Sequence, residues 1–280
     1  MFLSWCNFAV SIPKTMYIAG YIASIFIGIS LGLIGGGGSI LTVPVLVYLF
    51  GVDAALATTY SLFIVGTTSV MGSFSYFKKG LVNIKMAAVF GVPSIISVFL
   101  TRAYIMPVIP AQIFSAGSFT LTKSIFLMLI FAVLMVVASY SMIKKGRQAG
   151  EDTLQKQKFN YPLVFSIGIL VGIITGFIGA GGGFLIIPVL ANLLKLPMKA
   201  AVGTSLLIIS TNSLVGFVFS LAHTAVHWHF LLTITFIAIA GILIGSFLSA
   251  KIEGKKLKPA FGWFVLVMGI YIIIKETWLK

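Results

Sequence analysis

Charged residues are scarce in this chain, and acidic residues are scarcer still. Only 9% of the 280 residues are charged, five Asp and Glu stand against 19 Lys and Arg, and 59% of the residues are hydrophobic, with a mean hydropathy of +1.14. A water-soluble domain carries about 25% charged residues, and it still leaves much of its surface in water. The composition therefore excludes a soluble globular protein and predicts a chain surrounded by lipid.

The chain also lacks the groups that several kinds of chemistry need. Cys6 is the only cysteine, which excludes an internal disulfide and a cysteine-based metal or redox cluster. All five acidic residues fall in expected loops or at segment ends, whereas cation and proton pumps normally keep a carboxylate in the middle of a spanning segment. There is no carboxylate pair at membrane depth, no cysteine nucleophile and no Ser-His-Asp set, so we predict that the protein is not an enzyme and uses no cofactor.

The formal net charge of +14 would suggest a nucleic-acid partner in a soluble protein. In a membrane protein the same excess has another source, because Lys and Arg collect in cytoplasmic loops. We therefore expect the lipid bilayer to be a partner of this chain and nucleic acid not to be one.

Apolar runs bounded by charged or turn residues predict ten segments. Eight of them are long enough to span a membrane. The second and the seventh hold only about a dozen residues each, which at about 1.5 Å per residue is little more than half of the ~30 Å hydrocarbon layer. The segments cover approximately residues 17–34, 39–50, 54–77, 86–106, 122–143, 161–178, 184–194, 200–222, 230–250 and 259–275.

An internal repeat organises these segments. The stretch GLIGGGGSILTVPVL, Gly32 to Leu46, aligns without gaps with GFIGAGGGFLIIPVL, Gly176 to Leu190, at a shift of 144 positions. The same register continues beyond these stretches and matches, among others, Ser69 with Ser213. Five segments per half is an odd number, so if all ten cross the membrane the second half enters from the opposite side and the repeat is inverted. If each short segment is instead one arm of a re-entrant hairpin, the other loops keep the same sides.

The predicted fold class is all-α: a polytopic membrane protein with two inverted-topology repeats of about five helical segments each. The first transmembrane repeat covers residues 1–143, a cytoplasmic linker 144–160, and the second repeat 161–280. With the N-terminus outside, the inside loops carry fourteen Lys and Arg and the outside loops five, one of them Arg102. That bias is typical of cytoplasmic loops, and it predicts that both termini lie outside.

Each half carries a glycine run where a long segment gives way to a short one. A glycine costs about 1 kcal/mol relative to alanine in a helix interior, so each run predicts a helix break followed by a half-helix. Amides at such a break must face protein, water or a ligand rather than lipid, and the first N–H groups of a helix attract anions. The sequence therefore predicts an anion site where two such ends meet near the membrane midplane. The alternative is that the glycines only permit close helix packing.

Small polar side chains follow each glycine run at matched positions of the third and eighth segments. A site of amides, hydroxyls and dipoles without a carboxylate favours anions over Na⁺ or metal ions. For each hydroxyl, the alternative is a hydrogen bond to its own helix. The predicted substrate-binding residues are Gly35, Gly36, Gly37, Gly38, Ser39, Thr59, Ser61 and Thr67 in the first half, and Gly179, Gly181, Gly182, Gly183, Thr204, Ser205, Thr211 and Asn212 in the second.

The only histidines, His223, His227 and His229, cluster between the eighth and ninth segments. The first two are one helical turn apart, a spacing that can hold a metal ion, but no Cys or acidic residue is close to them in the sequence. We predict no metal site and expect interfacial hydrogen bonding beside Trp228, with proton sensing on the outer face as an alternative.

The two glycine blocks, GLIGGGGSILTVP and GFIGAGGGFLIIP, each followed by TTYSL or GTSL, resemble the sulfite exporter TauE/SafE family of membrane proteins. The resemblance covers about residues 17–275. It implies a secondary carrier in the plasma membrane of a prokaryote that handles sulfite, sulfoacetate or related organosulfonates. The first half departs from the second in having TTYSL in place of GTSL, and Ser39 at the position that matches Gly183.

Together these observations predict a secondary transporter that moves a small sulfur-containing anion by alternating access. Two alternatives remain open at this point. An anion-selective channel would show flux near diffusion rates, and a non-transporting membrane assembly partner would show no flux of any anion.

Overall fold

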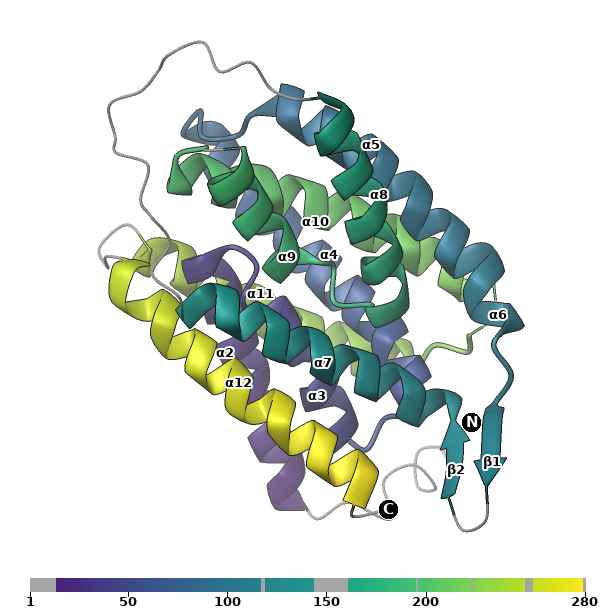
Figure 1. Ribbon diagram of the computed structural model, residues 1–280. Coiled ribbons are helices and arrows are strands. Elements are labelled where there is room, and N and C mark those ends of the chain that lie inside the picture. The colour runs from purple at the N-terminus through teal and green to yellow at the C-terminus, as the bar shows by residue number, and fades with distance from the viewer. Residues whose placement is uncertain are drawn as a thin grey trace.

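The computed structural model describes residues 14–116, 119–143, 161–194, 196–222, 224–249 and 254–278. These residues form helices, one β-hairpin and the loops that connect them (Figure 1). The predicted linker, 144–160, lies outside the described residues, and so do both ends of the chain.

The first half contains five helical segments. They are α2 (Lys14–Ile34), the short α3 (Ser39–Tyr48), α4 (Ala54–Lys78), a continuous rod made of α5 (Ile84–Leu100), the π-helical turn η1 (Thr101–Ile105) and α6 (Met106–Val108), and then α7 (Lys123–Ile143). A two-stranded antiparallel hairpin, β1 (Gln112–Ala116) and β2 (Phe119–Thr122), connects α6 to α7 and pairs Phe114 with Leu121.

The second half repeats this order without a hairpin in its described part. It contains α8 (Tyr161–Ile178), the short α9 (Gly183–Pro188) continued by the π-helical turn η2 (Val189–Leu193), α10 (Met198–Leu221), α11 (Trp228–Leu248) and α12 (Gly254–Trp278). Within the described ranges, six helices are long and apolar enough to cross a membrane, and α3 and most of α8 are shorter apolar helices. The predicted all-α polytopic fold is confirmed, and the hairpin is an addition that the sequence analysis did not predict.

Side-chain caps fix where two helices of the first half begin. Asp53 accepts a hydrogen bond from the amide of Ala55 at 2.9 Å, and Asn83 accepts one from the amide of Met86 at 3.1 Å. Such caps satisfy amides that have no partner inside the helix. Asp53 also accepts a hydrogen bond from the hydroxyl of Ser124, so the start of α4 is tied to the start of α7.

The two halves exchange a helix. Helix α2 packs along α11, and α8 packs along α5, so each pair joins helices from different halves. The 144-residue shift relates α2 to α8 and α5 to α11, and therefore the two pairs are counterparts. We call α2, α3, α4 and α11 the first bundle, and α8, α9 with η2, α10 and α5 the second bundle. The bundles meet through α4 and α10, while α7 and α12 pack side by side in opposite directions (Figure 1).

Glycines bring the exchanged helices into close contact. A Cβ at Gly28 of α2 would lie 2.1 Å from the carbonyl oxygen of Ala238 of α11, and a Cβ at Gly172 of α8 would lie 2.4 Å from that of Ser94 of α5. Gly28 and Gly172 are 144 positions apart, so both halves use the same device. In lipid the hydrophobic effect does not drive helices together. Small residues at helix interfaces instead let membrane helices approach closely and gain dispersion contacts.

Two equivalent hydrogen bonds show how α4 and α10 are arranged. The amide of His227 donates to the hydroxyl of Tyr60 at 2.8 Å, and the amide of Asn83 donates to the hydroxyl of Thr204 at 2.9 Å. Each bond joins the early part of one helix to the residue that follows the other helix and precedes the next, so α4 and α10 run antiparallel. An inverted repeat would produce this arrangement. The orientation of each half across the bilayer and the boundaries of the two repeats stay predictions.

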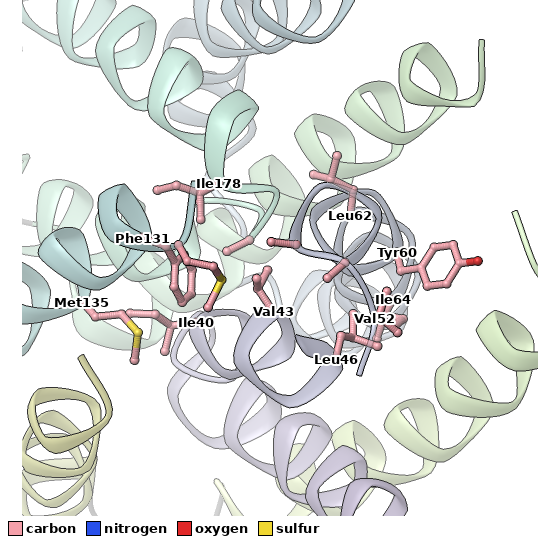
Figure 2. Packing of buried hydrophobic residues seen from close by; sticks show 14 of the residues in the cluster. Ile40, Val43, Leu46, Val52, Tyr60, Leu62, Ile64, Phe131, Met135 and Ile178 are labelled. Carbon is pink, nitrogen blue, oxygen red and sulfur yellow. The ribbon is translucent and has the colours of Figure 1, made fainter. Parts of the chain in front are cut away.

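Buried apolar side chains hold the short helix α3 in the interior (Figure 2). Ile40, Val43 and Leu46 of α3 belong to one buried cluster with residues of α4 and α7, among them Leu62 and Phe131. The outer faces of the long helices instead carry large exposed apolar side chains, such as those of Phe26, Phe236 and Trp263. A chain in contact with lipid requires apolar residues both in its interior and on its outer faces.

We expect the substitution Gly241→Leu in α11 to destabilise the protein. A Cβ at Gly241 would lie 2.4 Å from the carbonyl oxygen of Ile25 in α2, and overpacking of this kind costs about 1–3 kcal/mol. The control is Ala240→Leu, at the neighbouring exposed position of the same helix. Thermal unfolding in detergent would show a lower Tm for Gly241→Leu only, and equal Tm values for both variants would contradict the close packing of α2 and α11.

Candidate functional site

Both predicted helix breaks are present. Helix α2 ends at Ile34 before α3 begins at Ser39, and α8 ends at Ile178 before α9 begins at Gly183. The chain leaves the helix at matched glycines, Gly35 with φ 79° and Gly179 with φ 71°. This left-handed conformation is one that glycine adopts without a steric cost. We call residues 35–38 and 179–183 the glycine loops; the second includes Gly183, the first residue of α9.

The two glycine loops meet inside the protein. A Cβ at Gly36 would lie 2.5 Å from the carbonyl carbon and oxygen of Gly183, and a Cβ at Gly183 would lie 2.8 Å from the Cα of Gly36. All residues of both loops are buried. Two segments related by the repeat therefore touch through their backbones. The anion site expected where two half-helix starts meet stays a prediction.

Backbone amides in both loops are not used by the fold. Among the residues that the structure describes, no hydrogen bond is donated by the amides of Gly36, Gly37 and Gly38, or by those of Ala180, Gly181 and Gly182. The loops lead into the starts of α3 and α9, where the helix dipole adds partial positive charge. Buried amides of this kind are normally paired, so these groups can bind an acceptor such as an anion.

The alternative role of the glycines, close packing, is also present in the structure. A Cβ at Gly38 would lie 2.2 Å from the carbonyl oxygen of Ile27, and a Cβ at Gly35 would lie 2.4 Å from a methyl group of Val202. The counterpart of that second contact is Gly179, whose Cβ would lie 2.3 Å from the carbonyl oxygen of Thr58. The glycines therefore do two things: they end the helices, and they let the surrounding helices approach.

Two hydroxyl groups lie against the second glycine loop without a partner. A Cβ at Gly181 would lie 2.6 Å from Oγ of Ser213, and a Cβ at Gly182 would lie 2.1 Å from Oγ1 of Thr175. Both hydroxyls are buried and have no hydrogen-bond partner in the described part of the chain. The same is true of Ser69, the counterpart of Ser213.

The set of predicted site residues did not include these three. The match of Ser69 with Ser213 in the repeat was the available signal for two of them. Thr175 offered a weaker signal, since it lies four residues before Gly179 and its counterpart is Leu31.

Most of the predicted polar side chains form hydrogen bonds with backbone groups of the protein and are not left available for a ligand. Ser39 donates to the carbonyl of Gly36 at 2.7 Å, Thr59 to that of Ala55 at 3.4 Å, and Ser205 to that of Val202 at 2.8 Å. Thr204 accepts the amide hydrogen bond of Asn83. These residues are buried near the start of α3, α4 or α10, but their hydroxyls are already engaged.

Thr67 and Thr211 lie further from the interior than predicted. Their hydroxyls donate to carbonyls of their own helices, that of Phe63 at 2.7 Å and that of Leu207 at 3.1 Å. Thr211 is exposed and Thr67 partly exposed, whereas the glycine loops are buried. The hydroxyls of this pair are therefore engaged by their own helices and do not share the burial of the loops.

Two of the predicted polar side chains retain a buried atom without a partner in the described structure. These are Oγ of Ser61 and Oδ1 of Asn212. The other end of the Asn212 amide donates to Oγ of Ser94 at 2.6 Å. Of the histidines, His223 lies outside the described residues, and elsewhere in the described ranges no three metal-ligating side chains come together.

Comparison with known proteins identifies relatives across almost the whole chain. The profile of the family described as sulfite exporter TauE/SafE matches residues 21–272. A probable membrane transporter protein of Xylella fastidiosa (strain 9a5c) is 30% identical over 252 residues, which cover 88% of this chain and 91% of the relative. The probable membrane transporter protein YunE of Bacillus subtilis (strain 168) is 28% identical, covering 86% and 89%. The protein MJ0441 of Methanocaldococcus jannaschii, named in the same way, is 27% identical, covering 92% and 94%. No solved structure matches the chain.

We expect Ser213→Ala to leave the stability of the protein unchanged or to raise it slightly. Its hydroxyl is buried without a partner, so removal relieves a desolvation cost and breaks no hydrogen bond. Thr204→Val is the control, because it removes the acceptor of the Asn83 amide and should cost about 1–3 kcal/mol. Thermal unfolding without added anion measures both. A loss of stability in Ser213→Ala as large as that in Thr204→Val would show that Ser213 has a structural partner.

Proposed function

This chain belongs to the sulfite exporter TauE/SafE family, and we propose that it is a secondary transporter of a small sulfur-containing anion such as sulfite, sulfoacetate or a related organosulfonate. The family and the relatives named as membrane transporters support transport rather than catalysis. We place the protein in the plasma membrane of a prokaryote, with both termini outside and residues 144–160 in the cytoplasm.

One observation carries the proposal of an anionic substrate: two buried glycine loops touch each other and keep backbone amides that the fold does not use. Backbone N–H groups at helix starts favour negative charge. Neither acidic residue of the described ranges opposes this, because Asp53 caps α4 and Glu276 contacts Tyr48 at the far end of α3. The substrate would therefore bind a site built mainly from peptide amides and from the hydroxyls of Ser61, Ser69, Thr175 and Ser213.

The architecture supports alternating access as the mechanism. The glycine loops lie where the first and second bundles meet, and each bundle is held together by its glycine-lined helix pair. A tilt of one bundle against the other about the contact between α4 and α10 would open the loops to one side of the membrane and then to the other. Related arrangements of repeats place the substrate between two units that rock against each other.

Transport in proteoliposomes tests the proposal directly. Purified protein would be reconstituted, and flux of sulfite, sulfate, sulfoacetate and taurine would be compared with that in protein-free liposomes. We expect saturable uptake and counterflow of at least one sulfur-containing anion. Flux near diffusion rates would indicate a channel, and no flux of any anion would indicate an assembly partner.

Substitution of Gly182 should abolish most of this transport. Gly182 and Gly80 share a left-handed backbone, with φ of 67° and 65°, but a Cβ at Gly182 meets Thr175 whereas a Cβ at Gly80 meets nothing within 4 Å. Gly182→Ala and Gly80→Ala therefore carry the same backbone strain, of order 1–2 kcal/mol. They differ in that only the methyl group at position 182 collides with a neighbour, in the glycine loop.

We expect Gly182→Ala to lower the transport rate at least tenfold, a change of about 1.4 kcal/mol, and Gly80→Ala to stay close to wild type. Insertion of both variants into the membrane would be checked by the yield of folded protein. A double variant, Gly37→Leu with Gly182→Leu, that kept full activity would refute the assignment of the site to the glycine loops.

A further inference from the structure

Arg102 is a buried cation without a counterion in the described structure. It lies in η1, near the end of the rod that α5 begins, and its side chain is 3% exposed. One guanidinium nitrogen, Nη1, donates to the hydroxyl of Thr58 at 3.3 Å. The other two, Nε and Nη2, are buried and have no partner among the described residues. From the sequence alone, Arg102 is only one of the five basic residues expected on the outer side.

The two unpartnered nitrogens form one edge of the guanidinium plane. Their N–H groups point the same way and donate two parallel hydrogen bonds to two oxygens of a carboxylate, sulfonate or similar oxyanion. A buried charge without a partner is costly, and in a membrane protein it normally marks a site of function. An anion bound to the Nε–Nη2 edge would offset that cost.

Arg102 lies close to the second glycine loop in space, because a single residue, Thr58, contacts both. Thr58 accepts the hydrogen bond from Arg102, and its carbonyl oxygen is the atom that a Cβ at Gly179 would meet at 2.3 Å. The preceding residue, Thr101, packs against Gly176 at the end of α8, where a Cβ would lie 2.6 Å from that of Thr101. The hydroxyl of Thr101 is also buried without a partner, so polar groups that need an acceptor or donor gather here.

The π-helical turn η1 has no counterpart at the matched positions of the second half, whose own π-helical turn, η2, follows α9. The matched positions in the second half begin at Gly245 in the regular helix α11, where Ser246 stands in place of Arg102. Isolated π-helical turns occur often at functional sites. Lys123 contacts the residue that follows the turn: its ammonium donates to the carbonyl of Met106 at 2.6 Å and brings a second positive charge to the same end of the rod.

We propose that Arg102 is a substrate-binding residue: its Nε–Nη2 edge binds an oxyanion with two neighbouring oxygens as the anion passes between the second glycine loop and the side of the membrane where α5 ends. The inference rests on the proposed function, since it names a contact of the transported anion. It predicts that the substrate carries a sulfonate, sulfite or carboxylate group. A halide is disfavoured because it offers a single acceptor atom to the two N–H groups of the Nε–Nη2 edge.

Arg102→Met tests the proposal, since it keeps an unbranched apolar stem and removes the charged guanidinium. The control is Lys78→Met, which removes one positive charge from an exposed position at the end of α4. For Arg102→Met we expect the half-saturating sulfite concentration to rise about 10- to 100-fold, the loss typical of charge-assisted hydrogen bonds. Without anion, the Tm of the variant should equal or exceed that of wild type, because an uncompensated charge is gone. A lower Tm with unchanged half-saturation would assign Arg102 a structural role only.

Binding measured apart from transport separates the two proposals. The readout is the rise in Tm that added sulfite produces in purified wild type, Lys78→Met and Arg102→Met. If wild type transports sulfite and Arg102→Met matches it in transport and in Tm shift, the role of Arg102 is overturned and the proposed function stands. If wild type transports nothing but sulfite raises its Tm through Arg102, the site stands and the proposed function fails. If sulfite, sulfoacetate and sulfate raise no Tm and are not transported, both are overturned.

A third measurement uses the wild-type protein and needs no variant to fold. The chain has two arginines, Arg102 and Arg147, and the second lies in the predicted linker. Phenylglyoxal, which modifies arginine, would be applied with and without sulfoacetate, because sulfite would add to the aldehyde of the reagent. The modified residues would be identified by mass spectrometry. We expect sulfoacetate to protect Arg102 and not Arg147. Equal modification of Arg102 in both conditions, or no modification of it in either, would contradict the proposal.

Discussion

Backbone hydrogen bonding inside a bilayer is the constraint on which this structure depends. Lipid offers no partner for an N–H or C=O group, so a break in a helix must be enclosed by protein. Both breaks here are enclosed, because the two glycine loops are buried and lie against each other, with Gly36 against Gly183. Packing around the loops offsets the free-energy cost of interrupting two helices. The loop amides that donate no hydrogen bond provide polar groups in an otherwise apolar interior.

The exchange of helices between the halves gives that enclosure its form. Because α2 packs on α11 and α5 packs on α8, each glycine loop is covered by elements of both halves rather than by its own neighbours alone. The glycines of α2, α8 and α11 allow these pairs to approach within backbone contact. The same residue type therefore serves two needs, close helix packing and helix interruption, and its spacing distinguishes them: every fourth residue along a helix in the first, consecutive residues in the second.

Most of the fold followed from hydropathy, segment length and the repeat, because these depend on local sequence. All ten segments are helical, and α3 and α9 are short, as their lengths predict. The residues of the candidate site were predicted less well from the sequence. A match in the repeat shows that Thr67 and Thr211 occupy equivalent places, but not that the shared face points outward. Counting charges placed Arg102 on a side of the membrane, whereas its burial depends on the packing of α4, α8 and η1. The hairpin was missed because its short strands carry no strong apolar run.

The exchanged helices also impose an order on biosynthesis. The ribosome makes α2 early, yet 194 positions separate its last residue, Ile34, from Trp228 at the start of α11. During that interval the glycine face of α2 has no native partner and must be shielded by lipid or by the insertion machinery. Assembly of the first bundle therefore waits for the second half to emerge, and neither half can mature as an independent unit.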